Sequence, residues 1–256
     1  MGTDAEGGAP GDAGGGVLDS LPMKKLSVDI WSDIACPWCY VGKRRLEAAL
    51  SQFAHRDDVV VTWRAFELDP AAPAVRDTTV GYAERLARKY GMPTAQAVAA
   101  IKNLTDVAAG DGLDFHFEKA RPGNTFDAHR VIHLALEHGV QDAVKERLLR
   151  AYMTDGIAVG DRKALADVAA EAGLDRGEVS AMLESSRFAD EVREDEAKAA
   201  ELGITGVPFF VIGGRYAVSG AQPASVLKGA LEKAWAEANG PVQFGEGAAC
   251  GPEGCA

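Results

Sequence analysis

Apolar and polar residues alternate over Leu26–Trp31, which predicts a half-buried strand. Residues Val59–Phe66 are rich in β-branched and aromatic side chains and predict a second strand. The near-continuous apolar start of this second segment predicts a central strand that is covered on both faces. Between the two strands, apolar residues recur at helical spacing from Pro37 to about Ala54. A strand–helix–strand unit of this length predicts a parallel pair of strands.

The middle of the chain carries a different pattern, because its apolar residues repeat with helical spacing from about residue 78 to residue 203. Glycines that follow several of these runs predict helix ends, and Asp161 and Asp175 predict helix N-caps. Residues 111–123 predict a loop in which Phe115 and Phe117 pack against a neighbour. The predicted helices are Val80–Tyr90, Thr94–Ala109, Thr125–Glu137, Asp142–Thr154, Arg162–Ala172, Arg176–Glu184 and Phe188–Leu202.

Strand signals return near the end of the chain. Two apolar runs, Val207–Ile212 and Arg215–Ser219, are separated by two glycines and predict a β-hairpin, and a last helix is expected from Pro223 to about Ala238. The predicted order is β–α–β, a long helical stretch, then β–β–α. This order is typical of an α/β thioredoxin fold with a large all-helical insertion. We therefore expect a discontinuous thioredoxin-like domain over residues 23–70 and 203–240, with a helical insertion over residues 71–202.

Composition changes this picture at the two ends. The chain has 256 residues and 47% hydrophobic content, enough for a sizeable core, but residues 1–22 are rich in Gly, Ala and Asp and predict a disordered extension. Residues 241–256 are Gly-rich and predict a flexible tail.

The net charge of −11, without a block of Lys or Arg, argues against a nucleic acid or an anionic membrane as partner. The apolar runs are also too short to span a bilayer.

The candidate chemistry lies in Cys36-Pro37-Trp38-Cys39, where the first strand gives way to a helix. Unpaired N–H groups and the helix dipole at this point favour a thiolate on Cys36. Cys39, one helical turn later, is close enough to form a disulfide with Cys36. Two cysteines at this spacing are also found in zinc sites or as buried apolar residues. A redox pair is favoured, because strand, cysteine pair and helix follow in the order that such a pair requires.

The four cysteines form two close pairs, and this usage favours a reducing compartment over a secreted disulfide scaffold. The first residues lack the basic start and the apolar segment of a secretory signal, so we expect a cytoplasmic protein. The second pair, Cys250 and Cys255, has two interpretations. It is either a second redox pair that exchanges with Cys36 and Cys39, or part of a solvated tail without a role.

Four further residues leave alternatives open. Pro208 begins an apolar strand, where it cannot donate a ladder hydrogen bond; it lies either on an edge strand with a trans bond, or after a cis Val207–Pro208 bond that exposes the Val207 backbone beside Cys36. Asn124 either caps the helix that begins at Thr125 or lines a cleft. His129 and His133 have the spacing of metal ligands, but without an acidic partner motif we favour packing roles and expect no metal site.

Segment Ser32–Gly42 resembles the active-site segment of the DsbA-like thioredoxin family, in its FrnE-type branch. Three further parts of the chain are similar to that branch, and the resemblance covers residues 24–239. The tail pair also resembles an extra cysteine pair of some FrnE-like proteins. The three parts are Trp63–Leu68, Asn124–Arg130, and Gly203–Phe210 with Ser219–Gln222.

The resemblance implies a thioredoxin fold with a helical insertion, a cis Pro208, and thiol–disulfide exchange. Cys36 would attack and Cys39 would resolve the mixed disulfide. Pro37 and Trp38 would tune the surroundings of Cys36, while Val207 and Pro208 would hold the substrate backbone. Asn124 and His129 are candidate cleft-lining residues. The implied partners are protein thiols and disulfides or a redox partner protein. No cofactor is required, and glutathione or a dithiol reductant is a candidate co-substrate.

The main hypothesis is therefore a cytoplasmic protein disulfide oxidoreductase or isomerase. The alternative is a glutathione-dependent transferase, or an enzyme like 2-hydroxychromene-2-carboxylate isomerase, acting on a small aromatic or polyketide-like molecule. Such relatives usually carry serine at the first cysteine position, whereas this chain has Cys36. A third hypothesis is a redox-sensing binding module. The sequence determines neither the oligomeric state nor the direction of exchange.

Overall fold

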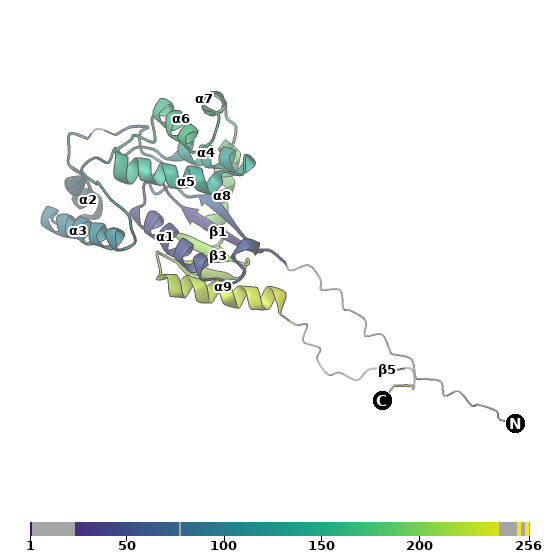
Figure 1. The fold of residues 1–256 in the computed structure, drawn as a ribbon. Coiled ribbons are helices and arrows are strands. Elements are labelled where there is room, and N and C mark those ends of the chain that lie inside the picture. Colours follow the sequence, from purple (N-terminus) through teal and green to yellow (C-terminus); the bar gives the residue numbers. More distant parts are fainter. Residues whose placement is uncertain (2–23, 77, 241–249, 252–253, 256) are drawn as a thin grey trace.

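A four-stranded mixed sheet lies at the centre of the computed structural model, with strand order β2-β1-β3-β4 (Figure 1). β1 (Leu26–Ser32) pairs in parallel with β2 (Val59–Ala65) and antiparallel with β3 (Phe209–Ile212). β4 (Tyr216–Ser219) continues the sheet as the second strand of the predicted hairpin. The N-terminal β–α–β unit and the C-terminal β–β–α unit, far apart in sequence, thus share one sheet. This arrangement is an α/β thioredoxin fold with a helical insertion.

The structure describes residues 1, 24–76, 78–240, 250–251 and 254–255. The disordered extension predicted for residues 1–22 therefore lies outside the described residues, apart from Met1. The same holds for most of the tail predicted over residues 241–256.

The prediction that the second strand is central was wrong, because β2 lies at the edge of the sheet, whereas β1 and β3 are its interior strands. The apolar start of β2 is only partly covered, and Val60 is 45% exposed. Coverage begins further along, where α4, α5 and α8 contact β2 and where Trp63 and Ala65 are buried. An apolar run of β-branched residues suits any extended strand, so the run did not separate an edge from a centre.

On the outer side of this edge strand, backbone N–H and carbonyl groups form hydrogen bonds to side chains instead of to another strand. Gln141 accepts a hydrogen bond from the Trp63 N–H at 2.9 Å and donates one to the Trp63 carbonyl at 3.0 Å. The Ala65 N–H donates to Asp195 Oδ2 at 2.9 Å. An edge closed in this way no longer offers these groups to a passing chain.

Two helices cover one side of the sheet. α1 (Pro37–Ser51) packs against α9 (Ala224–Asn239), and α9 contacts β1, β3 and β4 (Figure 1). Leu26, Val28 and Ile30 project into this core from alternate positions of β1 and are buried. The opposite face of β1 carries Trp31, which joins a smaller cluster with residues of α8 and β3. Both faces of β1 are therefore covered, as its interior position requires.

The insertion between β2 and β3 is helical, as predicted, and each helix lies within a few residues of its predicted range. α5 ends earlier than expected, at Arg150, and continues as one π-helical turn over Ala151–Asp155. A 3₁₀ turn over Arg56–Asp58 precedes β2. The helices are α2 (Tyr82–Tyr90), α3 (Thr94–Gly110), α4 (Phe126–Glu137), α5 (Gln141–Arg150), α6 (Arg162–Glu171), α7 (Arg176–Leu183) and α8 (Ala189–Glu201).

The insertion falls into two groups of helices in space. α4 to α8 pack together, with α4, α5 and α8 against β2, while α2 and α3 pack against each other at one end of the molecule (Figure 1). Phe115 and Phe117, in the predicted loop after α3, are buried as expected, and Phe115 stacks on Tyr40 of α1. Among the described residues, no helix is both long and apolar enough to cross a bilayer.

Candidate active site

The cysteine pair lies where β1 gives way to α1. Cys36 is the N-cap residue, and the helix starts at Pro37 without an acidic residue in its first turn. Cys39 follows in that turn, and its N–H donates to the Cys36 carbonyl at 3.1 Å. Both are free thiols; Cys36 is 5% exposed and Cys39 is fully buried. Cys36 thus keeps the small exposed surface that an attacking sulfur needs, and Cys39 is shielded behind it.

The segment before β3 meets Cys36 from 171 positions away in the sequence. The Cys36 thiol donates a hydrogen bond to the Val207 carbonyl at 3.5 Å. The Val207–Pro208 peptide bond is cis, as the resemblance implies. Pro208 is buried, and its carbonyl accepts the Gly220 N–H at 2.8 Å. The chain thus brings a backbone carbonyl to the sulfur that would react.

Gly42 of α1 permits this close approach. A Cβ atom at position 42 would lie 2.9 Å from Cγ of Pro208 and 3.3 Å from the ring of Phe210. The first distance is shorter than side-chain carbons tolerate, so any larger residue forces Pro208 or the helix to move.

We therefore expect Gly42→Ala to reduce the free energy of unfolding by about 1–3 kcal/mol, because overpacking strains the core. Gly229 of α9 provides the matched control, since a Cβ there meets nothing within 4 Å. Gly229→Ala should instead stabilise by about 0.5–1 kcal/mol through helix propensity. Denaturant unfolding of both variants measures the difference, and an equal gain in both would show that Pro208 does not press on α1.

A cavity of about 1140 Å³ lies beside Cys36. The thioredoxin part contributes Cys36, Pro37, Trp38 and Val207 to its wall, and the insertion contributes much of α2 and α3. Trp38 is 39% exposed, so it presents a broad apolar surface at the reacting end. The insertion side is basic and aromatic, with Arg76, Arg85, Arg88, Lys89, Tyr82, Tyr90 and Tyr152. A ligand that reaches Cys36 would therefore contact both parts of the chain.

A buried carboxylate forms part of the same wall. Asp33 is 1% exposed, and its Oδ2 accepts the Leu68 N–H at 2.8 Å. Nε2 of His129 lies 3.4 Å from Asp33 Oδ1. Burial acts to raise the pKa of Asp33, but His129, the Leu68 N–H and Thr125 together outweigh it, and this pKa is lowered. The neighbours of Asp33 thus favour the charged carboxylate near the thiols.

No motif of the sequence marks Lys145, yet this residue is completely buried close to the cysteine pair. Burial raises the pKa of the Cys39 thiol well above its usual value and Cys36 adds to this effect, whereas Lys145 acts in the opposite direction. The signal was present in the sequence, because Lys145 precedes Leu148 and Leu149 by three and four residues, on the apolar stripe of α5.

Comparison with known proteins agrees with this geometry. The profile of the family described as DSBA-like thioredoxin domain matches residues 27–232. The chain belongs to this family. It is 48% identical to a probable DsbA oxidoreductase, SCO1869 of Streptomyces coelicolor, whose crystal structure superposes with a TM-score of 0.79 over 90% of this chain and 98% of that one.

Two more distant proteins extend the comparison. YwbO of Bacillus subtilis, an uncharacterized protein, is 27% identical over 190 residues, which is 73% of this chain and 87% of that one. A 2-hydroxychromene-2-carboxylate isomerase shares the fold at 17% identity, with a TM-score of 0.56 over 82% of this chain and 97% of that one. Family membership and the cysteine pair together support a redox enzyme.

The structure corrects the assignment of Asn124 and His129 as cleft-lining residues. The neighbours Gly123 and Thr125 line the cavity, but neither Asn124 nor His129 does. Asn124 lies one residue before Thr125, the N-cap of α4, and its side chain accepts the N–H of Phe126, the first residue of the helix, at 2.8 Å. It thus pairs with an N–H at the helix start without being the N-cap residue that was expected. His129 is 1% exposed and faces Asp33 from within the core. The resemblance placed both residues near the site, but a match in sequence does not tell an inward side chain from one at the surface.

His129 and His133 do not share a ligand site. Nε2 of His133 lies 2.9 Å from Asp195, whereas His129 faces Asp33. Over the residues that the structure describes, no group of three or more His, Cys, Asp or Glu side chains is arranged to hold a metal ion. Each histidine instead has a buried acidic neighbour of its own from another part of the chain, which the spacing of the two histidines did not indicate.

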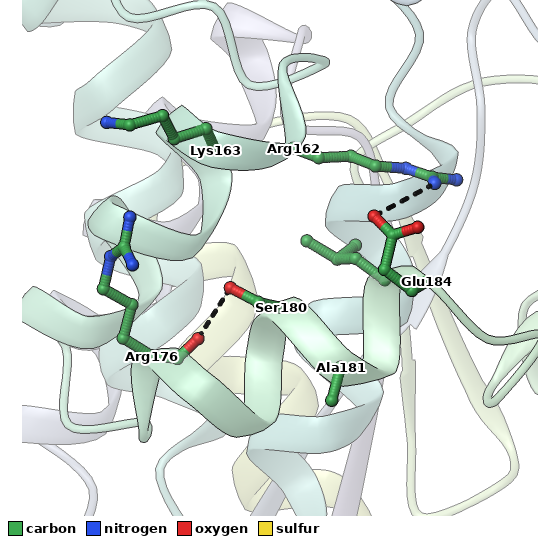
Figure 2. A pocket seen from close by; sticks show the side chains of 7 residues that line it. Arg162, Lys163, Arg176, Ser180, Ala181 and Glu184 are labelled. Carbon is green, nitrogen blue, oxygen red and sulfur yellow. Dashed lines mark hydrogen bonds and ion pairs between the residues drawn. The ribbon is translucent and has the colours of Figure 1, made fainter.

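A smaller cavity of about 430 Å³ lies between α6 and α7 (Figure 2). Arg162 pairs with Glu184 at 3.9 Å across it, and the Ser180 hydroxyl donates to the Arg176 carbonyl of its own helix at 2.9 Å. No residue of the cysteine pair contributes to its lining. Because these polar groups already have partners, this hollow offers no group prepared for catalysis.

The described part of the tail consists of two short segments. β5 (Cys250–Gly251) and β6 (Gly254–Cys255) pair antiparallel, with Cys250 opposite Cys255 in the register. The backbone therefore brings the two cysteine positions together. Whether this DsbA-like chain uses them in redox chemistry stays a prediction.

Proposed function

We propose that this protein is a FrnE-type thiol–disulfide oxidoreductase that acts on protein disulfides in the cytoplasm. The observation that carries the proposal is Cys36, a free thiol at the N-cap of α1 that lines the large cavity and contacts the Val207 carbonyl. Cys39, one turn later and buried, is the matching second thiol. The two close cysteine pairs support a reducing compartment.

The reaction has two exchange steps. The Cys36 thiolate attacks one sulfur of a substrate disulfide, an S–S bond forms between protein and substrate, and the other substrate sulfur leaves as a thiolate. Cys39 then attacks the Cys36 sulfur, and the second substrate sulfur leaves. The substrate gains two electrons and the cysteine pair loses two. The same steps in reverse oxidise a dithiol. If another thiolate of the substrate, instead of Cys39, attacks the mixed disulfide, the disulfides of the substrate are rearranged and Cys36 is released.

The surroundings of Cys36 support a polypeptide substrate. The Val207 carbonyl offers an acceptor for a backbone N–H of an extended peptide, and Pro208 fixes this segment against α1. Trp38 and Leu68, respectively 39% and 40% exposed, add apolar surface at the cavity. A peptide that carries the disulfide would bury these side chains as it docks.

Reduction of insulin by a small dithiol, run beside a glutathione-conjugation assay, tests the proposal. We expect the protein to accelerate insulin reduction and to form a trapped mixed disulfide when Cys39 is replaced by serine. Conjugation of glutathione to a small electrophile without insulin reduction would contradict it.

A second candidate function is favoured by the size and lining of the cavity. Its basic and aromatic side chains suit a small anionic aromatic molecule, so a glutathione-dependent transferase or isomerase is the alternative. The presence of both Cys36 and Cys39 supports the disulfide reaction instead, because a transferase needs no second thiol.

We further propose that Cys250 and Cys255 pass electrons to or from Cys36 and Cys39. Their opposed positions in β5 and β6 support a second reducible pair. Truncation after Phe244 should then lower turnover with a protein reductant while leaving the reaction with a small dithiol unchanged. A double Cys250→Ser, Cys255→Ser variant is the matched control for the loss of the tail itself. Unchanged rates with both reductants would assign the pair no part in the cycle.

A further inference from the structure

Lys145 is an unusual residue for the interior of a protein. It is fully buried, and no carboxylate in the described part of the chain lies within ion-pair distance of it. Its ammonium donates one long hydrogen bond, to the Ser32 carbonyl at 3.5 Å, and lies 5.5 Å from the centre of the Trp63 ring. Lysine is almost never fully buried without a partner, because removing its charge from water is costly. The cost of burying this charge therefore indicates that Lys145 has a role in function.

The groups around Lys145 belong to the redox site. Ser32 ends β1 directly before Asp33, and its own hydroxyl is buried without a hydrogen-bond partner. The titratable groups whose charges act on the lysine are Cys39 and Lys43 of α1, the N-cap residue Cys36, and Asp33 of the loop between β1 and α1. Burial lowers the pKa of Lys145 to about 8, and the sulfurs and Asp33 act in the opposite direction. At neutral pH the side chain is mainly an ammonium.

Cys39 presents the complementary difficulty. It must lose its proton before it can attack the mixed disulfide, yet it is fully buried and its pKa is raised well above the usual value by that burial. A thiolate at Cys39 is shielded from water, and it lacks the stabilising position at the helix N-terminus that Cys36 occupies. A nearby positive charge that is equally shielded from solvent lowers the cost of forming it.

We propose that Lys145 is a positioning residue for the second exchange step, in which its ammonium stabilises the Cys39 thiolate that resolves the mixed disulfide. The inference rests on the proposed function and concerns its second half alone. Cys39 releases its proton to water, its sulfur attacks the sulfur of Cys36, the bond between Cys36 and the substrate breaks, and the substrate leaves as a thiolate. Lys145 exchanges no electron and forms no bond; its charge acts through Cys39.

Lys43 provides a natural comparison within the same region. It is also buried, at 2% exposure, but Asp142 and Glu146 lie 3.1 and 3.2 Å from its ammonium, and Glu47 is a third partner. These carboxylates pair with the ammonium of Lys43 and neutralise it. The ammonium of Lys145 has no carboxylate partner among the described residues, so its charge acts on the sulfurs of Cys36 and Cys39. Lys43 is thus part of a structural ion-pair cluster, whereas the charge of Lys145 acts on the reaction.

The test uses the reduced full-length chain in which Cys250 and Cys255 are replaced by serine, so that Cys36 and Cys39 are its remaining thiols. The reagent is dithiobis(nitrobenzoate), a disulfide that releases a coloured thiolate at each exchange step. The first equivalent reports attack by Cys36, and the second reports resolution by Cys39. Cys39→Ser should release the first equivalent only, which assigns the second phase. In Lys145→Met, of similar length but uncharged, the first phase should persist. The second should slow by about tenfold or more at neutral pH, since one unit in the pKa of Cys39 changes its thiolate fraction tenfold.

The pH profile gives the readout that a purely structural role would not produce. The second phase of Lys145→Met should recover as the pH is raised, because Cys39 then ionises without help. Lys145→Gln serves as a second uncharged variant, and Lys43→Met should leave the profile unchanged. Unfolding measurements should find Lys145→Met at least as stable as the parent chain, because a buried unpaired charge has been replaced by an apolar group.

The outcomes separate this inference from the proposed function. Equal rates and equal pH profiles for the second phase in the parent chain and in both uncharged variants would overturn the role of Lys145 while leaving the disulfide reaction intact. A parent chain that releases no first equivalent would overturn the proposed function and the inference together. A slower second phase that does not recover at higher pH would assign Lys145 to packing and reject the electrostatic role.

Discussion

Replacement of Cys36 by serine is expected to remove disulfide exchange almost entirely, with a loss of about a thousandfold or more in the rate of insulin reduction. A hydroxyl at this position cannot form the mixed disulfide, however well the helix N-terminus and the Val207 carbonyl are placed. The fold should survive, since serine is close in size to cysteine and Cys36 keeps part of its surface at the cavity. Insulin reduction and circular dichroism together measure the two quantities.

Cys39→Ser is the matched variant, because it should retain the first attack and accumulate a mixed disulfide. The tail pair is a second control: if Cys250 and Cys255 react independently of the main site, Cys36→Ser would keep an activity that disappears when both tail cysteines are also replaced. Residual activity of Cys36→Ser that persists without the tail cysteines would contradict the assignment of Cys36 as the nucleophile.

Asp195→Ala should produce the largest loss of stability, about 3–5 kcal/mol, because it leaves buried donors without an acceptor. The Asp195 carboxylate accepts the Ala65 N–H of the edge strand at 2.9 Å and lies 2.9 Å from His133 Nε2 and 3.4 Å from Arg64. It thus joins α8, α4 and β2 at one point. Denaturant unfolding of the reduced protein measures the change.

Glu194→Ala, one residue earlier on an exposed position of α8, is the control for the loss of an acidic side chain and should change stability by less than about 0.5 kcal/mol. Asp195→Asn keeps one acceptor and should fall between the two. Equal stability of Asp195→Ala and Glu194→Ala would show that the edge of β2 finds another partner. In that case the network around His133 would contribute little to the fold.

The order of elements and the place of the cysteine pair could be predicted from the sequence because both depend on local signals. Period-two and helical spacing, with glycine and aspartate at helix ends, identified the strands and the seven helices of the insertion that the structure describes. A cysteine pair between a strand and a helix has its reactive end defined by the helix itself, so the N-cap position of Cys36 followed from that junction.

The tertiary structure alone decided which residues the cysteine pair meets. Whether β2 lay at the edge or the centre depended on the partners of β1, and whether His129 faced the cavity or the core depended on how α4 packs. Lys145 was hidden for the same reason: on α5 it is one lysine on an apolar stripe, and only the packing of α5 against β2 and the end of β1 brings its charge to the sulfurs. Spacing along a chain determines which face a side chain shares, but burial, charge and reactivity depend on what packs against that face.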